Sequence, residues 1–330
     1  MKYRKFGNLG WDVSEIGFGA WAIGGDMWGP QKDSDSFDAL NKAVDLGVNF
    51  IDTAQGYGKG HSEEIIGRFL KNRNETIYIA TKIPPVEGTN WPPSDNQDAN
   101  ISFPPKYIIE QCEKSLKRLQ RDYIDVYQFH TWTSSFNSQN EWFEAMSRLK
   151  EQGKIRAIGV SVHDTSPDNV IGSLILEKVD SVQVIYNIFE QYPQFNLFPV
   201  CERLNKAVVV RVPFDEGSLT GKFTEQTVFT EGDVRAHYFR GNNLKAVVKK
   251  VNEIKEVKDN NHPGMPMAEY ALRFALSHFA VSTVIPGMRN VQQADLNTKA
   301  SDGNILPSNE KEELKKYYWR KDFWNNEIKI

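Results

Sequence analysis

The chain lacks several features that would have indicated particular classes of protein. Its 330 residues include only two cysteines, Cys112 and Cys201, whose spacing fits neither a disulfide framework nor a zinc motif. We therefore expect two reduced, buried thiols. No apolar run approaches the roughly 20 residues that a membrane-spanning helix needs, and residues 1–6 lack the apolar core of a signal peptide. The sequence thus predicts a cytoplasmic protein with no membrane partner.

An excess of charge of either sign is also missing. Lysine and arginine number 40 and aspartate and glutamate 43, which gives a formal net charge of −3. Because binding to nucleic acids depends on an excess of positive charge, we expect no nucleic acid partner. Five of the six histidines show no metal-ligand spacing, and no metal site is expected. These five are His61, His163, His237, His262 and His278.

Short β-rich runs alternate with helical patterns from one end of the chain to the other. Several of the runs are almost continuously apolar, as is typical of strands that are covered on both faces. The eight runs are Ser14–Ala20, Asn49–Ala54, Ile77–Lys82, Tyr123–His130, Ile155–Val162, Ser181–Asn187, Ala207–Phe214 and Val281–Gly287. Between them, apolar residues recur at helical spacing, as Phe37, Leu40 and Val44 do.

This alternation predicts the fold class. Strands that alternate with helices pack as parallel strands joined by crossovers. An open doubly wound sheet for dinucleotides would carry GxGxxG after its first strand, where this chain has Gly17-Phe18-Gly19-Ala20-Trp21. Eight units favour instead an α/β protein with one (β/α)8 TIM barrel domain over residues 1–330. We expect an N-terminal β-hairpin before the barrel and long loops at its C-terminal face.

Three long segments interrupt the alternation. They are Pro84–Pro104, Phe214–Asn243 and the tail Asp302–Ile330. The first two follow the C-terminal ends of predicted strands, and that face of a barrel carries the chemistry of barrel enzymes. Long loops in compact domains are usually functional or disordered, so these segments are expected beside the site.

Four chemically matched side chains stand at or just after the ends of three consecutive predicted strands. Asp52 ends the second strand and Tyr57 follows it, Lys82 ends the third and His130 ends the fourth. Each residue alone is more often structural, but the set is harder to explain by chance. A lysine cation lowers the pKa of a nearby phenol, an aspartate holds the lysine, and a histidine can orient a carbonyl. This set suits protonation of an oxygen while hydride reaches the adjacent carbon.

At this point a family resemblance becomes visible. The run Asp52-Thr53-Ala54-Gln55-Gly56-Tyr57-Gly58, followed by Ser62-Glu63 and Ile66-Gly67, resembles the aldo-keto reductase signature DTAxxYGxGxSExxIG. Ala80–Lys82 and Asp125–His130 are similar to the lysine and histidine strands of that family. Further matches are Gly159–Ser161, Val212–Lys222 and Ile285–Asn297. The resemblance covers residues 2–297 and includes the branch related to beta subunits of voltage-gated potassium channels.

The resemblance implies roles residue by residue. Tyr57 would be the general acid, Lys82 and Asp52 would tune it, and His130 would orient the carbonyl. Arg289 would meet a 2′-phosphate, which favours NADP(H) over NAD(H) because a guanidinium forks onto phosphate oxygens. The other residues expected to bind the cofactor are Trp21, Ser161, Gln183, Arg211, Pro213, Phe214, Gly217, Ser218, Leu219, Gly287, Gln293 and Asn297.

The chain departs from the family pattern at four positions. Val162 replaces an asparagine, Val212 replaces a serine, Leu296 replaces a glutamate, and Arg211 stands where an aromatic residue usually stacks on the nicotinamide. Arg211 has three readings. It can stack on the ring, bind an anionic group of the substrate, or form a buried ion pair with Asp215 or Glu216.

These residues lead to one main hypothesis and two alternatives. We expect an NADP(H)-dependent oxidoreductase that reduces a small aldehyde or ketone such as a sugar derivative, with Trp28, Trp132 and His163 around the substrate. The first alternative is a redox-neutral epimerase or dehydratase that holds its NADP(H) tightly. It follows from Arg211, because a cation disfavours the oxidised ring. The second is an NADP-binding regulatory subunit without turnover. The oligomeric state is left open.

Overall fold

The computed structural model describes residues 1–328, so Lys329 and Ile330 at the end of the predicted tail lie outside the described residues. Its central feature is a sheet of eight strands whose neighbours all pair in parallel, in the order β10-β9-β8-β7-β6-β5-β4-β3. The strands are β3 (Phe18–Gly19), β4 (Phe50–Asp52), β5 (Tyr78–Ile83), β6 (Ile124–Phe129), β7 (Ile155–Ser161), β8 (Ser181–Ile185), β9 (Ala207–Arg211) and β10 (Val281–Val284). Each predicted run overlaps one of them, which confirms the strand prediction.

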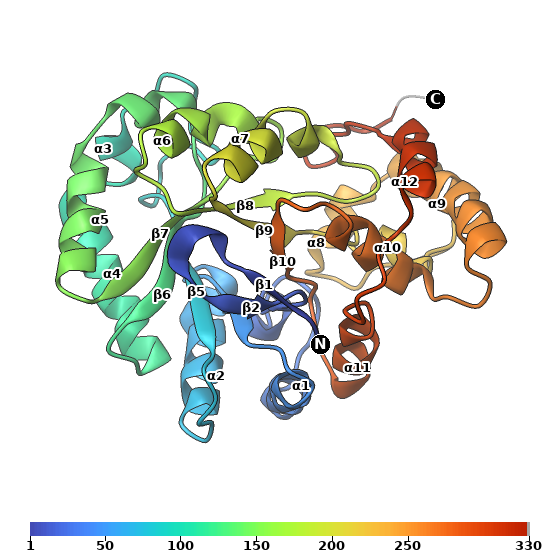
Figure 1. The fold of residues 1–330 in the computed structure, drawn as a ribbon, viewed down its shortest axis with the longest axis horizontal. Helices are drawn as coiled ribbons and strands as arrows, with labels where there is room; N and C mark the ends of the chain where they lie inside the picture. The colour runs from blue at the N-terminus through green and yellow to red at the C-terminus, as the bar shows by residue number, and fades with distance from the viewer. Residues whose placement is uncertain (329–330) are drawn as a thin grey trace.

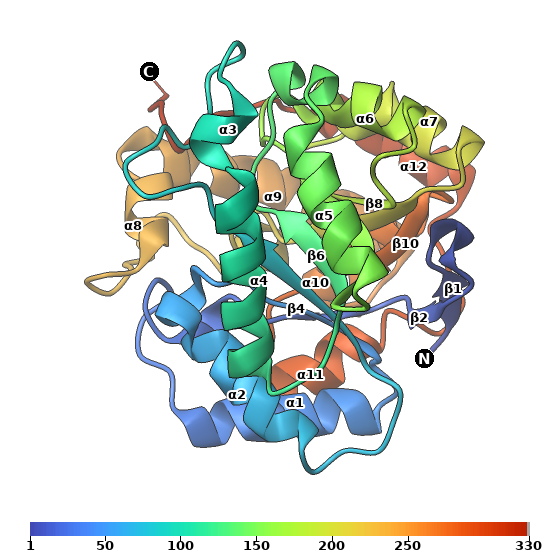
Figure 2. The same ribbon diagram turned by 90° about the vertical axis from the view of Figure 1, so that its left-hand side faces the viewer.

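The two edges of this sheet meet, so the strands form a barrel. Ile16 bridges to Val284 and Gly19 bridges to Gly287, both in parallel, which joins the first strand region to the last. Helices surround the strands (Figures 1 and 2). They are α1 (Asp33–Asp45), α2 (His61–Leu70), α4 (Pro105–Leu119), α5 (Glu141–Glu151), α6 (Ile171–Ile175), α7 (Leu197–Arg203), α10 (Met267–Leu276) and α11 (Val291–Thr298). The expected (β/α)8 barrel is confirmed.

The predicted N-terminal hairpin closes one end of the barrel. Strands β1 (Tyr3–Lys5) and β2 (Asp12–Ser14) pair antiparallel. Phe6 and Trp11, which lie between them, pack in a buried cluster with residues near the starts of the barrel strands, among them Phe50, Ala80 and Val126. The Phe6 ring lies 5.4 Å from the Phe50 ring, centroid to centroid. Because apolar rings fill this end, the interior is accessible only from the opposite end of the strands.

The alternation of side chains along the strands then sets what lies above this apolar layer. In a strand every second residue points to the same side. Counting two residues on from Phe50, Ala80 and Val126 gives Asp52, Lys82 and Gln128. A polar layer therefore sits on an apolar one at the C-terminal end of the barrel, which is the end where barrel enzymes carry their chemistry.

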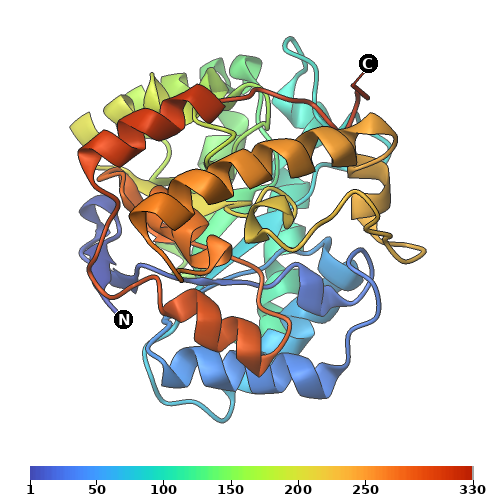
Figure 3. The same cartoon turned by 90° about the vertical axis from the view of Figure 1, so that its right-hand side faces the viewer.

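The three long segments contain only short helices of their own. The segment after β5 contains only the short helix α3 (Ala99–Ser102), and the segment after β9 contains α8 (Val234–Tyr238) and leads into the long helix α9 (Asn242–Asn261). Figure 3 shows α9 beside α12 (Ser308–Leu314) and the tail. There the Lys250 ammonium lies 5.1 Å from the centroid of the Trp319 ring.

Two further expectations can be compared with the structure. Cys112 and Cys201 are both free and buried, as expected. Among residues 1–328 we find no helix that combines the length and the apolar character needed to cross a bilayer.

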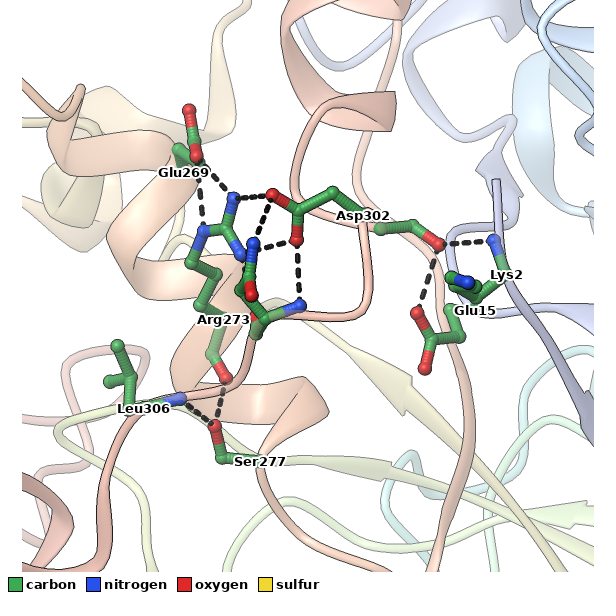
Figure 4. A network of polar contacts seen from close by, with 9 residues as sticks. Lys2, Glu15, Glu269, Arg273, Ser277, Asp302 and Leu306 are labelled. Atoms are coloured by element: carbon green, nitrogen blue, oxygen red, sulfur yellow. Dashed lines mark hydrogen bonds and ion pairs between the residues drawn. The ribbon is translucent and has the colours of Figure 1, made fainter.

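A buried arginine fastens the C-terminal segment to the barrel (Figure 4). Arg273 on α10 donates to Glu269 at 2.7 Å, to Asp302 at 2.7 Å and to the Asn304 carbonyl at 2.5 Å. Ser301, which directly precedes Asp302, accepts a hydrogen bond from the backbone N–H of Lys2 and donates to Glu15. Opposite ends of the chain are thereby joined.

We predict that Arg273→Ala lowers the free energy of unfolding by about 3 kcal/mol, because it leaves carboxylates without their buried partner. Urea denaturation measures this. Arg68→Ala is the matched control, since Arg68 pairs with Asp33 where the side chains are 47% and 42% exposed, and such pairs contribute about 0.5 kcal/mol or less. Equal losses in the two variants would contradict the assignment of Arg273.

Candidate active site

The polar layer at the barrel mouth centres on the ammonium group of Lys82. This side chain is fully buried. Its Nζ donates to Asp52 Oδ1 at 2.5 Å, to the Thr53 carbonyl at 2.9 Å and to Tyr57 Oη at 3.1 Å. An ammonium has three N–H donors, so all of them are used. Burial alone would lower the pKa of Lys82, but Asp52 and Tyr57 together raise it, and the group stays charged.

Because Tyr57 Oη accepts a hydrogen bond from Lys82, its own proton remains available for donation. Tyr57 begins the short 3-10 helix η3 (Tyr57–Gly60), whose Gly58 has a φ of 60°. A Cβ at Gly58 would lie 2.2 Å from the Gly24 carbonyl oxygen, so only glycine fits. The sequence led us to expect a lowered pKa for Tyr57. Instead burial raises the pKa of Tyr57 above its usual value, and Lys82 opposes this only in part.

Two buried glutamines complete the environment of Asp52. Gln183 Nε2 donates to Asp52 Oδ2 at 2.6 Å, and Gln128 Nε2 donates to the same oxygen at 3.2 Å. A Cβ at Gly159 would lie 2.6 Å from Gln128 Cγ, so the glycine of β7 leaves room for this side chain. Gln183, expected to bind a nicotinamide carboxamide, therefore also positions Asp52 through its amide nitrogen.

His130 follows β6 and lies beside the phenol. Its ring is 5.8 Å from the Tyr57 ring and 4.8 Å from the Trp91 ring, in edge-on geometry. Within residues 1–328 its buried Nδ1 has no hydrogen-bond partner. Burial, together with the charges of Lys82 and Arg211, holds the pKa of His130 well below its usual range. A neutral imidazole next to a protonated phenol can hydrogen-bond a carbonyl oxygen.

Aromatic residues cover the phenol on its other side. Trp21 stacks on Tyr57 with centroids 5.8 Å apart, and Trp28 meets Trp21 edge-on at 5.2 Å. The prediction that Trp132 forms part of the pocket wall is not met. It is 1% exposed and packs in an aromatic cluster with Phe136 and Trp142, because its indole fills the space between strands and helices.

Arg211, at the end of β9, reaches across the mouth to the loop after β7. Its Nη2 donates to the Val162 carbonyl at 3.0 Å and to Asp164 Oδ1 at 2.6 Å. The sequence suggested Asp215 or Glu216 as partners of a buried ion pair. The structure shows Asp164 in that role. The buried Nε of Arg211 has no partner within residues 1–328, so this donor is available to a ligand.

His163, in the loop after β7, lies near residues of two other segments, the one after β5 and the tail. Burial lowers the pKa of this half-buried histidine. Its Nδ1 accepts a hydrogen bond from the Thr165 backbone N–H at 3.1 Å. The carboxylates of Asp95 in the segment after β5 and Asp322 in the tail are close enough to influence it. His163 therefore lies close to all three segments, and its contact with a substrate stays a prediction.

The backbone after β9 has an unusual conformation. Val212, Asp215, Glu216 and Gly217 all have positive φ, at 52°, 48°, 54° and 99°. For a β-branched valine this is a genuine outlier, of the kind that clusters at functional sites. Asn187 Nδ2 holds the turn through the Val212 carbonyl at 2.9 Å. Pro213, Phe214, Ser218 and Leu219 lie in the same turn.

Side chains from the tail, from α8 and from the turn itself stabilise it. Asp215 is 2% exposed and accepts from Lys321 Nζ at 2.6 Å, from Ser218 Oγ at 2.6 Å and from Tyr238 Oη at 3.1 Å. Lys321 itself lies against aromatic rings, with Phe189 nearest at 4.6 Å. The tail is thereby tied directly to the loop after β9.

Arg289 lies beside a cavity of about 310 Å³ that Trp28, Asp233 and Arg235 also line. The Arg289 guanidinium donates to the Trp28 and Pro30 carbonyls and to Gln31 Oε1, at 2.9, 2.6 and 2.9 Å. These three partners are neutral, whereas Arg235 is paired with Asp233 at 2.5 Å. The cavity therefore carries an excess positive charge, which fits an anionic group.

The neighbouring residues of the predicted cofactor segment are held in place by hydrogen bonds. Gln293 Oε1 accepts from the Arg289 backbone N–H at 2.7 Å, and Asn297 Nδ2 donates to the Gly287 carbonyl at 3.3 Å. Asn290 caps α11 through the Gln293 N–H at 2.9 Å. Ser161, at the end of β7, is nearly buried and pairs in register with Gln183. Together these observations fit a dinucleotide along the mouth.

Sequence reasoning missed several of these residues. Gln128 lies two residues before His130 on β6 and therefore on the same side of the strand, so the alternation alone could have indicated it. The exposed Trp91 and the backbone carbonyl of Thr53 carried no comparable signal. Among residues 1–328 no cluster of metal-ligating side chains is present.

We predict that His130 stays neutral across the physiological range, because its pKa lies well below the usual value. The imidazole resonances of His130, assigned by comparison with His130→Gln, should not shift between pH 6.5 and pH 8 in NMR spectra. A titration centred near the ordinary value of about 6.5 would show that the ring is solvated and charged, and would contradict this account.

Comparisons with known proteins agree with the geometry. The family model described as "Aldo/keto reductase family" matches residues 15–318. Aldo-keto reductase YhdN of Bacillus subtilis (strain 168) is 33% identical over 302 residues, covering 89% of this chain and 87% of that protein. A probable voltage-gated potassium channel subunit beta of Arabidopsis thaliana is 28% identical, covering 93% and 92%.

A solved structure agrees as well. The structure of the glycerol dehydrogenase AKR11B4 from Gluconobacter oxydans superposes with a TM-score of 0.79 at 28% identity, and covers 96% of this chain and 94% of that one. The family match spans most of the barrel. The chain belongs to the aldo/keto reductase family.

Proposed function

We propose that this chain is an NADP(H)-dependent oxidoreductase that reduces an aldehyde or ketone, with Tyr57 as the proton donor. One observation carries the proposal. The Lys82 ammonium donates its three hydrogen bonds to Asp52, Thr53 and Tyr57. Because the phenol oxygen of Tyr57 accepts one of them, its own proton must point elsewhere. The neutral His130 beside it supplies a second group for a carbonyl oxygen.

Each residue at the mouth has a separate role in the proposed reaction. A nicotinamide held by Ser161 and Gln183, with the rest of the dinucleotide along the turn at Val212–Leu219, would supply hydride to the carbonyl carbon. His130 hydrogen-bonds the carbonyl oxygen and fixes its orientation, and Tyr57 transfers its proton to that oxygen as the bond to carbon becomes single. The resulting phenolate lies 3.1 Å from the Lys82 ammonium, which stabilises it until solvent returns a proton. Asp52 keeps the ammonium in place.

The choice of NADP(H) rests on Arg289. Among residues 1–328 its guanidinium pairs with no carboxylate, and a guanidinium binds phosphate through charge-assisted hydrogen bonds. The proposed substrate is a small polar carbonyl compound such as a sugar derivative. Aromatic surfaces of Trp21 and Trp91 and polar groups of His163 and Asp164 surround its place at the mouth.

A second candidate follows from Arg211. Its charge lies close enough to influence both Tyr57 and His130, and a cation there disfavours an oxidised nicotinamide. An enzyme that retains reduced cofactor can carry out redox-neutral epimerisation or dehydration. Mass spectrometry of the purified protein distinguishes the two. Tightly held NADP(H) that does not exchange with added nucleotide favours the second candidate, and an empty protein that consumes added NADPH excludes it.

We predict that Tyr57→Phe slows reduction of a suitable aldehyde by about 10²–10⁴-fold, the usual contribution of a general acid. The dissociation constant of NADPH should change by less than about threefold, since the ring is retained. Steady-state kinetics and fluorescence titration measure the two quantities. Tyr192→Phe, at a phenol that donates to Asp168 and forms no hydrogen bond with Lys82, is the control. Full activity in Tyr57→Phe would refute the proposed role.

A second substitution tests the cofactor. Arg289→Gln should weaken NADPH binding by about 10–100-fold, because a charge-assisted hydrogen bond is worth about 1.5–3 kcal/mol. NADH has no 2′-phosphate, so its affinity should change little. Equal weakening for both nucleotides would mean that Arg289 supports the loop at residues 28–31 instead of selecting the phosphate.

A further inference from the structure

A buried acid stands without a counter-charge in the turn after β9. Glu216 is 6% exposed, and within residues 1–328 no lysine, arginine or histidine forms an ion pair with it. Its carboxyl oxygens are not among the fully buried atoms that lack a partner, so a ligand can reach them. It directly precedes Gly217 in the turn whose backbone adopts positive φ. Burying an unpaired carboxylate costs several kcal/mol, so the group needs an explanation.

The charges around Glu216 are already paired with one another. Asp215 and Asp164 face it as carboxylates, and Arg211 and Arg235 face it as guanidinium groups. Arg211 is bound to Asp164 at 2.6 Å. Arg235 is bound to Asp233 at 2.5 Å, and Asp215 to Lys321 at 2.6 Å.

Glu216 therefore has no cation left to pair with and has two carboxylates as neighbours. Burial and those neighbours favour the uncharged form, and they raise the pKa of Glu216 to about 8. An uncharged carboxylic acid differs from a carboxylate in one decisive respect, because it can donate a hydrogen bond.

We propose that Glu216 binds the dinucleotide as a neutral carboxylic acid and donates a hydrogen bond to one of its phosphate or ribose oxygens. This inference rests on the proposed function, which places a dinucleotide along the turn at Val212–Leu219. A carboxylate at the same place would repel a phosphate. Glu216 thus makes the affinity of the site for NADP(H) depend on pH.

The expected pH dependence has a definite sign. Below about pH 8 the carboxyl group holds its proton and binding is at full strength. Above that value the free protein loses a proton that the complex requires, so affinity falls by up to tenfold per pH unit. The 2′-phosphate ionises near pH 6, and the pKa of Tyr57 is raised above its usual value of about 10. The interval from pH 7 to pH 9.5 therefore isolates Glu216.

The test is the dissociation constant of NADPH, measured by fluorescence titration from pH 7 to pH 9.5 with no carbonyl substrate present. The wild-type protein should bind at least tenfold more weakly at pH 9.5. Glu216→Gln keeps a donor without an ionisable proton, so it should bind at pH 7 within about threefold of wild type and show a flat profile. Glu216→Leu should bind about tenfold more weakly throughout.

A control and the contrary results complete the experiment. Glu253→Gln, on the exposed face of α9, should keep the wild-type profile, and thermal melting without nucleotide shows that each variant is folded. A flat wild-type profile, or a pH dependence that persists in Glu216→Gln, would overturn the role of Glu216 while leaving the proposed function intact. Absence of NADPH binding at every pH would overturn both.

Discussion

The buried ion pair between Lys82 and Asp52 is the interaction on which the site depends. Two charges taken out of water are tolerated only when their geometry is good and their remaining donors and acceptors are satisfied. Here the ammonium has three acceptors, and the carboxylate accepts from two glutamines as well. The Tyr57 phenol accepts a hydrogen bond from this ammonium, so its own proton is free to point elsewhere.

The barrel supplies the conditions that the pair needs. The hairpin residues Phe6 and Trp11 close one end of the interior with apolar rings, so water reaches the pair only from the mouth. Strand alternation then places polar side chains one layer above. At the mouth itself, the tail fastens the turn after β9 through Lys321 and Asp215, and Arg211 joins β9 to the loop after β7.

Much of this arrangement could be predicted from the chain alone. Eight apolar runs alternate with helical patterns, so periodicity was enough to indicate the barrel. Asp52, Tyr57, Lys82 and His130 carried a clear signal because strand ends of a parallel barrel share one face. The four meet through Lys82 and the ring contact of Tyr57 with His130.

The position of Trp132, the partner of Arg211 and the pKa of Tyr57 could not be predicted, because they depend on packing between distant parts of the chain. Trp132 follows a strand end as Trp21 and Trp28 do, yet it faces the space between strands and helices. The partner of Arg211 is distant in sequence, and proximity along the chain wrongly favoured Asp215 and Glu216. The pKa of Tyr57 was misjudged for the same reason, since neighbouring charge can be read from motifs but the depth of burial cannot.

The ionisation of Tyr57 tests the central claim most directly. The tyrosinate absorbance of the wild-type protein minus that of Tyr57→Phe, followed against pH, reports this single phenol. The account predicts ionisation only above pH 10, because burial outweighs the effect of Lys82 on the pKa of Tyr57. A phenol that ionises near pH 7 would contradict it, since Tyr57 would then rest as a phenolate and have no proton to donate.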